Sequence, residues 1–259
     1  MHNAKTVATV LKLHGEGLNN CEISRQTGVS RPTVRDWING RLPHSYRSAD
    51  SPRRGCPRCG CDAHRFDRLG PDYVHLLGLY LGDGSIAEHR RAVYRLRITL
   101  DVRYPCIVRE CEDVMRVVVP RNRVGRQLRT CNCYEVHAYS KSWPCLFPQH
   151  GAGLKHERRI ILTRWQQQLA ERWPEKLIRG MIQSDGCRFT NTGRCGWRHP
   201  RYSFSNVSTD ITSIFCSACD CLGLRWTAAF PKSESAAVSI YVSRKADVAK
   251  LDQFVGPKR

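Results

Sequence analysis

Two short segments, residues 76–84 and 178–186, repeat one pattern: an apolar run, two small residues four positions apart, and an Asp followed by Gly. The acids of the two copies, Asp83 and Asp185, are the best candidates in the chain for chemistry. The apolar runs predict helices, so each Asp would lie at a helix C-terminus, where the backbone dipole already presents negative charge. This placement costs stability unless a cation compensates it. A divalent metal ion is the natural partner.

The small residues determine how closely the two predicted helices can approach. Gly78 and Gly82 lie four residues apart in the first copy, and Gly180 and Ser184 in the second, so each pair lies on one face of its helix. Faces of this kind let two backbones come into close contact. We therefore expect the helices to pack side by side and to place the two acids next to each other.

The two segments resemble the LAGLIDADG motif of homing endonucleases. The repeat extends further, because residues 138–141 and 241–245 (Ala-Tyr-Ser-Lys and Tyr-Val-Ser-Arg-Lys) follow the two acids at nearly equal distances. It covers the chain from about residue 71 onward. A single copy would equally fit a buried helix that ends in Asp-Gly, a common helix-to-turn signal, but two copies in register favour the family.

The resemblance implies an α+β fold, a pseudo-symmetric pair of α-β-β-α-β-β-α LAGLIDADG units whose sheets straddle DNA. A monomer would then carry internal pseudo-two-fold symmetry. A small all-α helix-turn-helix module precedes the pair. The expected organisation is residues 1–42 for this module, 43–66 for a basic linker with a candidate zinc knuckle, 67–152 for the first half and 153–259 for the second.

The resemblance also implies a metal-dependent endonuclease, a hydrolase that cuts phosphodiester bonds of double-stranded DNA at a specific sequence. Asp83 and Asp185 would coordinate Mg²⁺, or Mn²⁺, between them and the scissile phosphates, with metal-bound water as the nucleophile. The family places a basic residue near the reacting water, in the region that Lys141, Arg244 and Lys245 match here. Ordinary phosphate contact is the alternative role for these three.

The composition favours a nucleic-acid partner. The formal net charge is +19, with 42 Lys and Arg against 23 Asp and Glu, and the sequence pI is about 9.7. Most of the positive charge is Arg, which suits phosphate and guanine edges, although a GC-rich genome produces the same bias. An anionic membrane surface is the competing partner. The chain shows neither a membrane-length apolar run nor an N-terminal signal, so we expect a cytoplasmic protein that associates with the nucleoid when it binds DNA.

Two predicted strands carry side chains for DNA contact. Residues 93–100 alternate, with apolar residues on one side and Arg95, Arg97 and Thr99 on the other. The matching strand of the second half, residues 201–206, has fewer charges and presents Ser203 and Ser205. The face with Arg95, Arg97 and Thr99 would contact DNA phosphates, and the face with Ser203 and Ser205 would contact bases through polar groups.

The first forty residues predict a helix-turn-helix. Periodicity indicates a first helix before Gly17, a second over residues 21–27 and a third over 31–38, with Gly28 in the turn and Ser30 capping the third. Residues Ile23, Val29, Val34 and Trp37 would form the core. The side chains of Arg31, Thr33 and Arg35 would face the major groove. A helical hairpin for protein contacts is the alternative.

The fourteen Cys residues are expected to be reduced, because no signal segment points to secretion. Residues 211–222 indicate an amphipathic helix in which Cys216, Cys219 and Cys221 act as small apolar residues. In contrast, Cys56, Cys59, Cys61 and His64 lie in a polar, Pro- and Arg-rich stretch and form a candidate zinc knuckle. The short spacing between Cys59 and Cys61 makes it awkward for all four to reach one ion. A surface loop of reduced thiols is the alternative.

One other class of function remains open on the sequence alone. Some bacterial sporulation regulators join a degenerate LAGLIDADG domain to a helix-turn-helix and bind DNA without cutting it. Their helix-turn-helix is C-terminal, whereas here it is N-terminal and both acids are present. These differences favour the enzyme. An endonuclease lodged in an intein is a poor fit, because the chain has no nucleophile at residue 1 and no His-Asn splice junction at its end.

Overall fold

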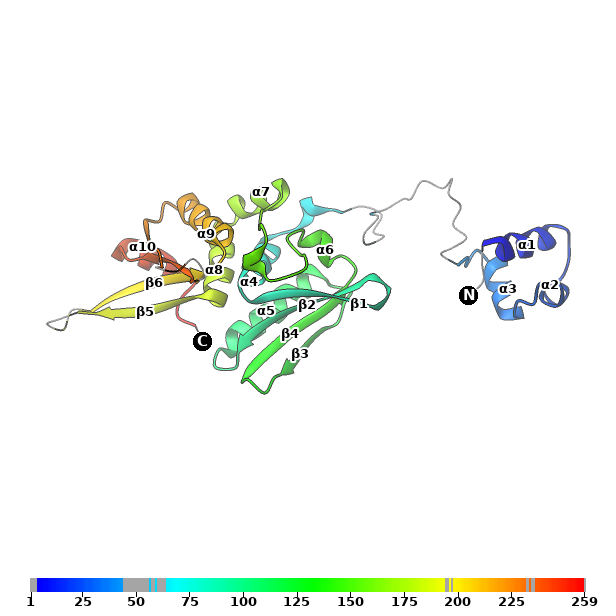
Figure 1. Cartoon of the computed structure of the whole chain (residues 1–259), viewed down its shortest axis with the longest axis horizontal. Coiled ribbons are helices and arrows are strands. Elements are labelled where there is room, and N and C mark those ends of the chain that lie inside the picture. Colours follow the sequence, from blue (N-terminus) through cyan, green and yellow to red (C-terminus); the bar gives the residue numbers. More distant parts are fainter. Residues whose placement is uncertain are drawn as a thin grey trace. The chain divides into compact units, whose positions relative to one another are not determined.

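The computed structural model describes residues 4–43, 56, 59, 64–193, 196, 198–231, 233 and 236–258. The chain divides into two units, Met1–Arg54 and Gly55–Arg259 (Figure 1). Among the described residues, no helix combines the length and the apolar character that crossing a bilayer requires.

The N-terminal unit is a three-helix module, as the sequence predicts. Its helices are α1 (Ala4–Gly15), α2 (Asn20–Thr27) and α3 (Arg31–Ile38). A capping box between Asn19 and Glu22 begins α2, and Gly28 ends it with a left-handed φ of 68°. The buried side chains form one small core of Val7, Val10, Ile23, Val29, Val34 and Trp37.

One detail of this module differs from the prediction. Ser30 occupies the N-cap position of α3, but its side chain makes no cap hydrogen bond to the helix backbone. The Ser30 hydroxyl instead shares a hydrogen bond of 2.8 Å with the hydroxyl of Thr33. A polar side chain three residues along offered a competing partner, which the cap rule alone does not foresee.

The second unit contains two copies of the predicted α-β-β-α-β-β-α arrangement. The first is α4 (Pro71–Asp83), β1 (Gly84–His89), β2 (Val93–Asp101), α5 (Pro105–Val118), β3 (Val124–Leu128), β4 (Cys133–Ser140) and α6 (Trp143–Leu146). The second is α8 (Pro174–Asp185), β5 (Gly186–Thr192), β6 (Arg198–Asn206), α9 (Thr209–Cys221), β7 (Trp226–Ala229), β8 (Val238–Val242) and α10 (Lys245–Asp252). Helix α7 (Arg164–Arg172) lies between the copies in sequence. The expected pseudo-symmetric α+β fold is confirmed.

The two sheets have the same topology. Their strand orders are β1-β2-β4-β3 and β5-β6-β8-β7, and all neighbouring strands are antiparallel. Each motif helix leads directly into the first strand of its sheet, so Gly84 pairs with Ile98 and Gly186 with Phe204. In β2 the apolar residues Leu96, Ile98 and Leu100 are buried, as the predicted alternation requires.

Helices α4 and α8 pack against each other at the centre of this unit (Figure 1). A Cβ atom at Gly78 would lie 2.5 Å from the carbonyl oxygen of Leu177, and one at Gly180 would lie 2.4 Å from that of His75. Real Cβ atoms do not come so close to backbone, so both positions require Gly. The close approach expected from the small residues is confirmed.

A buried polar network fixes the register of the two helices. A hydrogen bond of 2.6 Å joins His75 on α4 to Gln183 on α8, and Gln183 donates in turn to Glu110 on α5 at 2.9 Å. Arg179 completes the network with two hydrogen bonds to Glu110, at 3.0 and 2.6 Å. Burial lowers the pKa of His75. The network satisfies polar groups that would otherwise oppose the packing of three helices.

We predict that Gly78→Ala destabilises the protein by at least about 2 kcal/mol, because the added methyl group meets backbone atoms on α8 that cannot move aside. Urea unfolding of the full chain measures the change. Gly70→Ala is the matched control, since a Cβ at Gly70 would have nothing within 4 Å. Equal stability of the two variants would show that the helices can separate without cost.

Candidate active site

Asp83 and Asp185 lie at the adjoining C-terminal ends of α4 and α8. At this point the helices are still in contact: a Cβ at Gly82 would lie 2.1 Å from the hydroxyl oxygen of Ser184 and 2.9 Å from a carboxylate oxygen of Asp185. The carboxylate of Asp185 therefore lies against the backbone next to Asp83. The structure brings the two predicted acids together.

Two lysines that the sequence analysis did not single out lie on the same helix ends. The Lys155 ammonium donates to the carbonyl oxygens of Tyr80 (2.7 Å), Leu81 (2.9 Å) and Gly82, three of the last carbonyls of α4. The Lys258 ammonium donates to the carbonyl oxygen of Ser184 at 3.0 Å, near the end of α8. Each motif helix thus receives a cation at its negative end, which offsets the dipole and the adjacent carboxylate.

The electrostatics of the four groups are mutually dependent. Burial, reinforced by the negative charge of Asp185 and partly opposed by the two lysines, raises the pKa of Asp83 to about 6. Burial also raises the pKa of Asp185, against the opposing effects of Asn206 and both lysines. Burial lowers the pKa of Lys155 to about 8, although both aspartates oppose the change, and it lowers the pKa of Lys258. Both kinds of charge are held where water solvates them poorly.

The site is nevertheless open to a ligand. Asp83 is accessible to solvent, although protein atoms surround much of its carboxylate. It lines a pocket together with Asp101, Arg103, Tyr104, Gln183, Ser184 and Lys258. An oxygen-binding ion or an anionic group can therefore reach Asp83 from solvent, with Lys258 beside it.

The two acids differ in their partners. Asn206, near the end of β6, donates a hydrogen bond of 2.7 Å to the Asp185 carboxylate. The strand pairings place Leu100 at the equivalent position of the first half, two residues beyond the partner of the glycine that follows the acid. A leucine cannot hold a carboxylate, so Asp185 is oriented by its strand and Asp83 is not.

The structure does not bring Lys141, Arg244 and Lys245 to the carboxylates. Lys141 follows Ser140, which pairs with Tyr94, whereas the glycine after Asp83 pairs with Ile98. Tyr94 and Ile98 are four residues apart along β2, so Ser140 lies about 13 Å along the sheet from the glycine that follows Asp83. Arg244 and Lys245 lie beyond the end of β8 at the start of α10, displaced in the same way. All three are exposed. The basic residues at the acids are instead Lys155 and Lys258.

The outer face of the first sheet is organised by a buried acid. Glu135 is 3% exposed and forms ion pairs with Arg95, with Arg97 at 3.8 Å and with Arg129 at 2.6 Å. Although burial alone would raise it, these arginines lower the pKa of Glu135. Arg97 remains 47% exposed while Arg95 is 16% exposed, so the two predicted contacts are unequal. Thr99 is exposed beside them.

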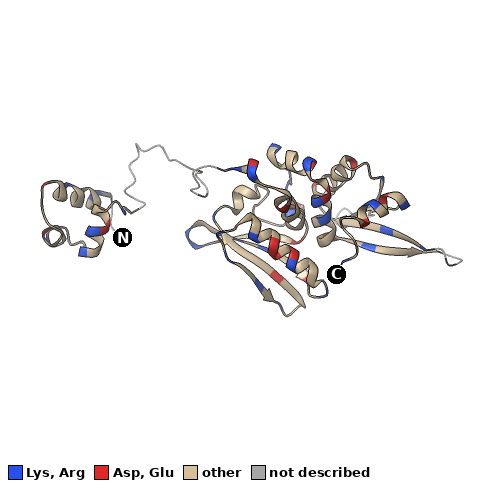
Figure 2. Ribbon diagram, turned by 180° about the vertical axis from the view of Figure 1, so that it is seen from behind, with Lys and Arg blue, Asp and Glu red and all other residues tan. Residues whose placement is uncertain are grey.

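The second sheet carries a different outer face. The hydroxyl of Ser203 lies 3.2 Å from the thiol of Cys187, and that of Ser205 lies 2.8 Å from the hydroxyl of Ser239. Both serines are half-buried on a surface with few charges, as the sequence predicts. Lys and Arg occur on both units of the chain (Figure 2). On the N-terminal module Arg31 and Arg35 are exposed, and Thr33 is half-buried through its contact with Ser30.

A family model described as a homeodomain-like domain matches residues 1–40, the span of the three-helix module. No curated protein matches the chain.

Several solved structures are similar to part of the chain. One is the homing endonuclease I-DmoI in complex with DNA and Mn, which is 14% identical with a TM-score of 0.49, over 72% of this chain and 96% of that chain. The same enzyme in complex with DNA and Ca is 16% identical with a TM-score of 0.48, over 71% of this chain and 88% of that chain. The N-terminal LAGLIDADG domain of DUF199/WhiA is 13% identical with a TM-score of 0.46, over 73% of this chain and 84% of that chain.

We predict that Asp83→Asn stabilises the metal-free protein at pH 7.5 by up to about 1 kcal/mol, after allowance for solvent screening. An acid whose pKa is raised to about 6 on folding opposes folding once it ionises, so the gain should grow from pH 4 to pH 6 and then level off. Thermal unfolding across this range in the presence of a chelator measures it.

Asp72→Asn is the control, because Asp72 lies in the first turn of the same helix, where the dipole favours an acid. A loss of stability for Asp83→Asn at pH 7.5 would show that attraction to the lysines outweighs burial.

Proposed function

We propose that the chain is a metal-dependent endonuclease that hydrolyses phosphodiester bonds of double-stranded DNA at a specific sequence. The observation that carries this proposal is the pair of carboxylates, Asp83 and Asp185, on the adjoining ends of two helices that glycine contacts hold together. Two partly buried carboxylates at helix C-terminal ends lower the stability of the fold, and the binding of a cation together with an anionic substrate would explain why they are placed there. One chain supplies both acids, so a monomer is sufficient.

The donor set fits a divalent ion that prefers oxygen. Two carboxylates with raised pKa values and a solvent-accessible side chain on Asp83 suit Mg²⁺ or Mn²⁺, which bind proteins through one or two carboxylates and take further oxygens from water and phosphate. When bound there, the ion supplies activation of water and stabilisation of the leaving oxygen. Asp83 and Asp185 would hold it, one from each half.

The lysines give the site positive charge where a scissile phosphate would lie. Lys155 and Lys258 are fixed by helix carbonyls, so their ammonium groups need no reorganisation to meet developing negative charge. With a pKa of about 8, Lys155 keeps its proton and its positive charge at neutral pH. Asp83 must be ionised to hold a cation, so activity should fall as the pH drops through about 6.

DNA binding would use the outer faces of both sheets and the N-terminal module. Arg97, held by Glu135, presents an exposed guanidinium for phosphate, and Ser203 and Ser205 offer hydroxyl groups on a face with little charge. Arg31 and Arg35 are exposed on α3, whereas Val34 and Trp37 of the same helix are buried in the module's core. The net charge of +19 supports binding to a polyanion.

A DNA-binding regulator that does not cut is the second candidate. The observation in its favour is the match of residues 1–40 to a homeodomain-like domain, because such a module would bind DNA with no contribution from the acids. The two candidates differ in one result, strand cleavage in the presence of Mg²⁺ or Mn²⁺.

We predict that Asp83→Asn and Asp185→Asn each lower metal-dependent cleavage at least about 100-fold, the equivalent of about 3 kcal/mol of transition-state stabilisation, while DNA affinity is retained. The experiment incubates the purified chain and a genomic DNA library with Mg²⁺ and sequences the ends produced. A nick in one strand from a single variant would indicate that each half addresses its own phosphate.

Lys155→Met and Lys141→Met form a matched pair for the same assay. The first should reduce cleavage strongly and the second should change only affinity, because Lys155 lies at the acids and Lys141 does not. If the wild type binds a defined duplex yet cuts nothing with either metal ion, the regulator replaces the endonuclease.

We predict that the double substitution Arg31→Ala with Arg35→Ala weakens DNA binding and reduces the salt dependence of affinity by about two phosphate contacts. Lys5→Ala is the control, because Lys5 is an exposed cation on α1, outside the third helix. Titrations of a labelled duplex at several salt concentrations measure both. Identical slopes for all variants would indicate that the module contacts protein instead.

A further inference from the structure

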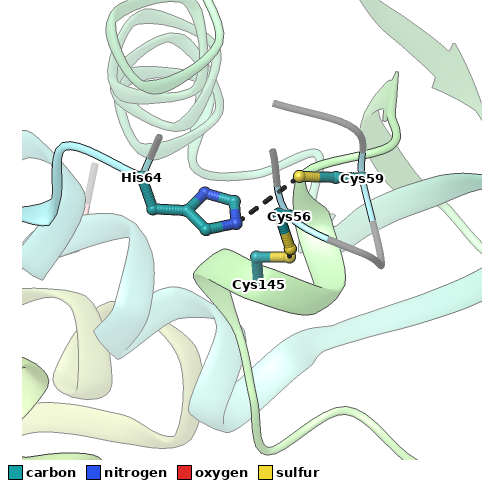
Figure 3. A group of neighbouring side chains, drawn as sticks. All are labelled: Cys56, Cys59, His64 and Cys145. Carbon is teal, nitrogen blue, oxygen red and sulfur yellow. Dashed lines mark hydrogen bonds between the residues drawn. The ribbon is translucent and has the colours of Figure 1, made fainter. Parts of the chain in front are cut away.

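Four metal-ligating side chains converge where the described residues of the linker meet α6. They are Cys56, Cys59 and His64 from the linker and Cys145 from α6 (Figure 3). One ligand atom from each lies within 4.8 Å of every other. Cys59 and Cys145 are buried, at 8% exposure each, and the other two are half-buried. The cluster is separate from the two acids and takes no part in the proposed cleavage.

The closest separations are those expected around one zinc ion. The Sγ atoms of Cys56 and Cys145 are 3.6 Å apart, and Sγ of Cys59 is 3.5 Å from Nε2 of His64. Tetrahedral zinc with Zn–S near 2.3 Å and Zn–N near 2.05 Å requires about 3.8 Å between sulfurs and about 3.6 Å between sulfur and nitrogen. The sulfur separation is also far longer than a covalent disulfide of about 2.05 Å.

We propose that Cys56, Cys59, His64 and Cys145 bind one structural Zn²⁺. Three thiolates and one imidazole form a closed, four-ligand set that suits a borderline-soft ion and leaves no position for water or substrate. This differs from the knuckle that the sequence predicts, because the fourth ligand comes from α6 and not from Cys61, which lies outside the described residues. The change removes the crowding of Cys59 and Cys61 on one ion.

The surrounding protein holds the ligands from both sides. The His64 ring stacks on Phe66, with centroids 5.0 Å apart, and Phe66 stacks on Trp165 of α7 at 4.2 Å. On the other side, Trp143 at the start of α6 donates to the carbonyl oxygen of Ala138 at 2.9 Å. Residues whose own positions are fixed by packing form a metal site at lower entropic cost.

The consequence is a cross-link between distant parts of the sequence. The ion would join the end of the basic linker to the first LAGLIDADG-like half, and so define where the connection to the N-terminal module begins. Because the ion would tie Cys56, Cys59 and His64 to α6, removal of the metal should loosen this junction without disturbing the contact between α4 and α8.

The test is the metal content of the full chain purified without chelator. We expect about one zinc per chain in the wild type, in Cys61→Ser and in Cys131→Ser, an exposed cysteine elsewhere, and less than about a tenth of that in Cys145→Ser. Cobalt loaded in place of zinc should show absorption typical of tetrahedral thiolate ligation. If Cys145→Ser fails to fold, His64→Cys serves instead, and it should retain the metal and shift the cobalt spectrum.

Three results would overturn the proposal. Wild-type protein without zinc would remove the site. Zinc retained by Cys145→Ser but lost by Cys61→Ser would assign the ion to the local knuckle. A mass about 2 Da lower under non-reducing conditions, restored by a reductant and absent from both Cys56→Ser and Cys145→Ser, would assign these two cysteines to a disulfide.

Discussion

The contact between the backbones of α4 and α8 is the constraint on which the rest of the second unit depends. Gly78 and Gly180 allow the two helix axes to come closer than any side chain would permit. Once the helices touch along this face, their C-terminal ends also meet, and with them the acid that ends each helix. The electrostatic cost of the site is therefore a consequence of its packing, since neither acid can withdraw without separating the helices.

Lys155 and Lys258, which are bound to the ends of the two helices, partly offset this electrostatic cost. The lysines lie on the last carbonyls, where they lower the dipole energy and the repulsion of the carboxylates together. Their own pKa values are lowered by burial, so the compensation is incomplete. Charges that are poorly solvated and only partly compensated favour the binding of a ligand of opposite charge. Such charges are typical of catalytic and ligand-binding sites.

The sequence predicted what short-range patterns encode. The apolar runs, the small residues and the Asp-Gly ends located both motif helices, and the alternation of residues 93–100 located a strand. Lys155 and Lys258 were not found, because they lie more than seventy residues along the chain from the helix ends they contact, one in a short 3-10 helix and one near the C-terminus, and no periodicity marks them. Cys145 was missed for the same reason: its neighbours in sequence are apolar, and only the fold brings it to Cys56.

The two halves share a backbone but not their side chains, and this difference bears on the substrate. Asn206 orients Asp185 while Leu100 stands at the matching position beside Asp83, and Arg97 on one sheet corresponds in register to Ser203 on the other. Two identical subunits would have to present identical surfaces and would match a palindromic site. Because one chain encodes both halves, each surface can differ. For the proposed endonuclease, a charged face and a hydroxyl-rich face side by side favour an asymmetric target, in which one half-site is held mainly through phosphates and the other is read through its bases.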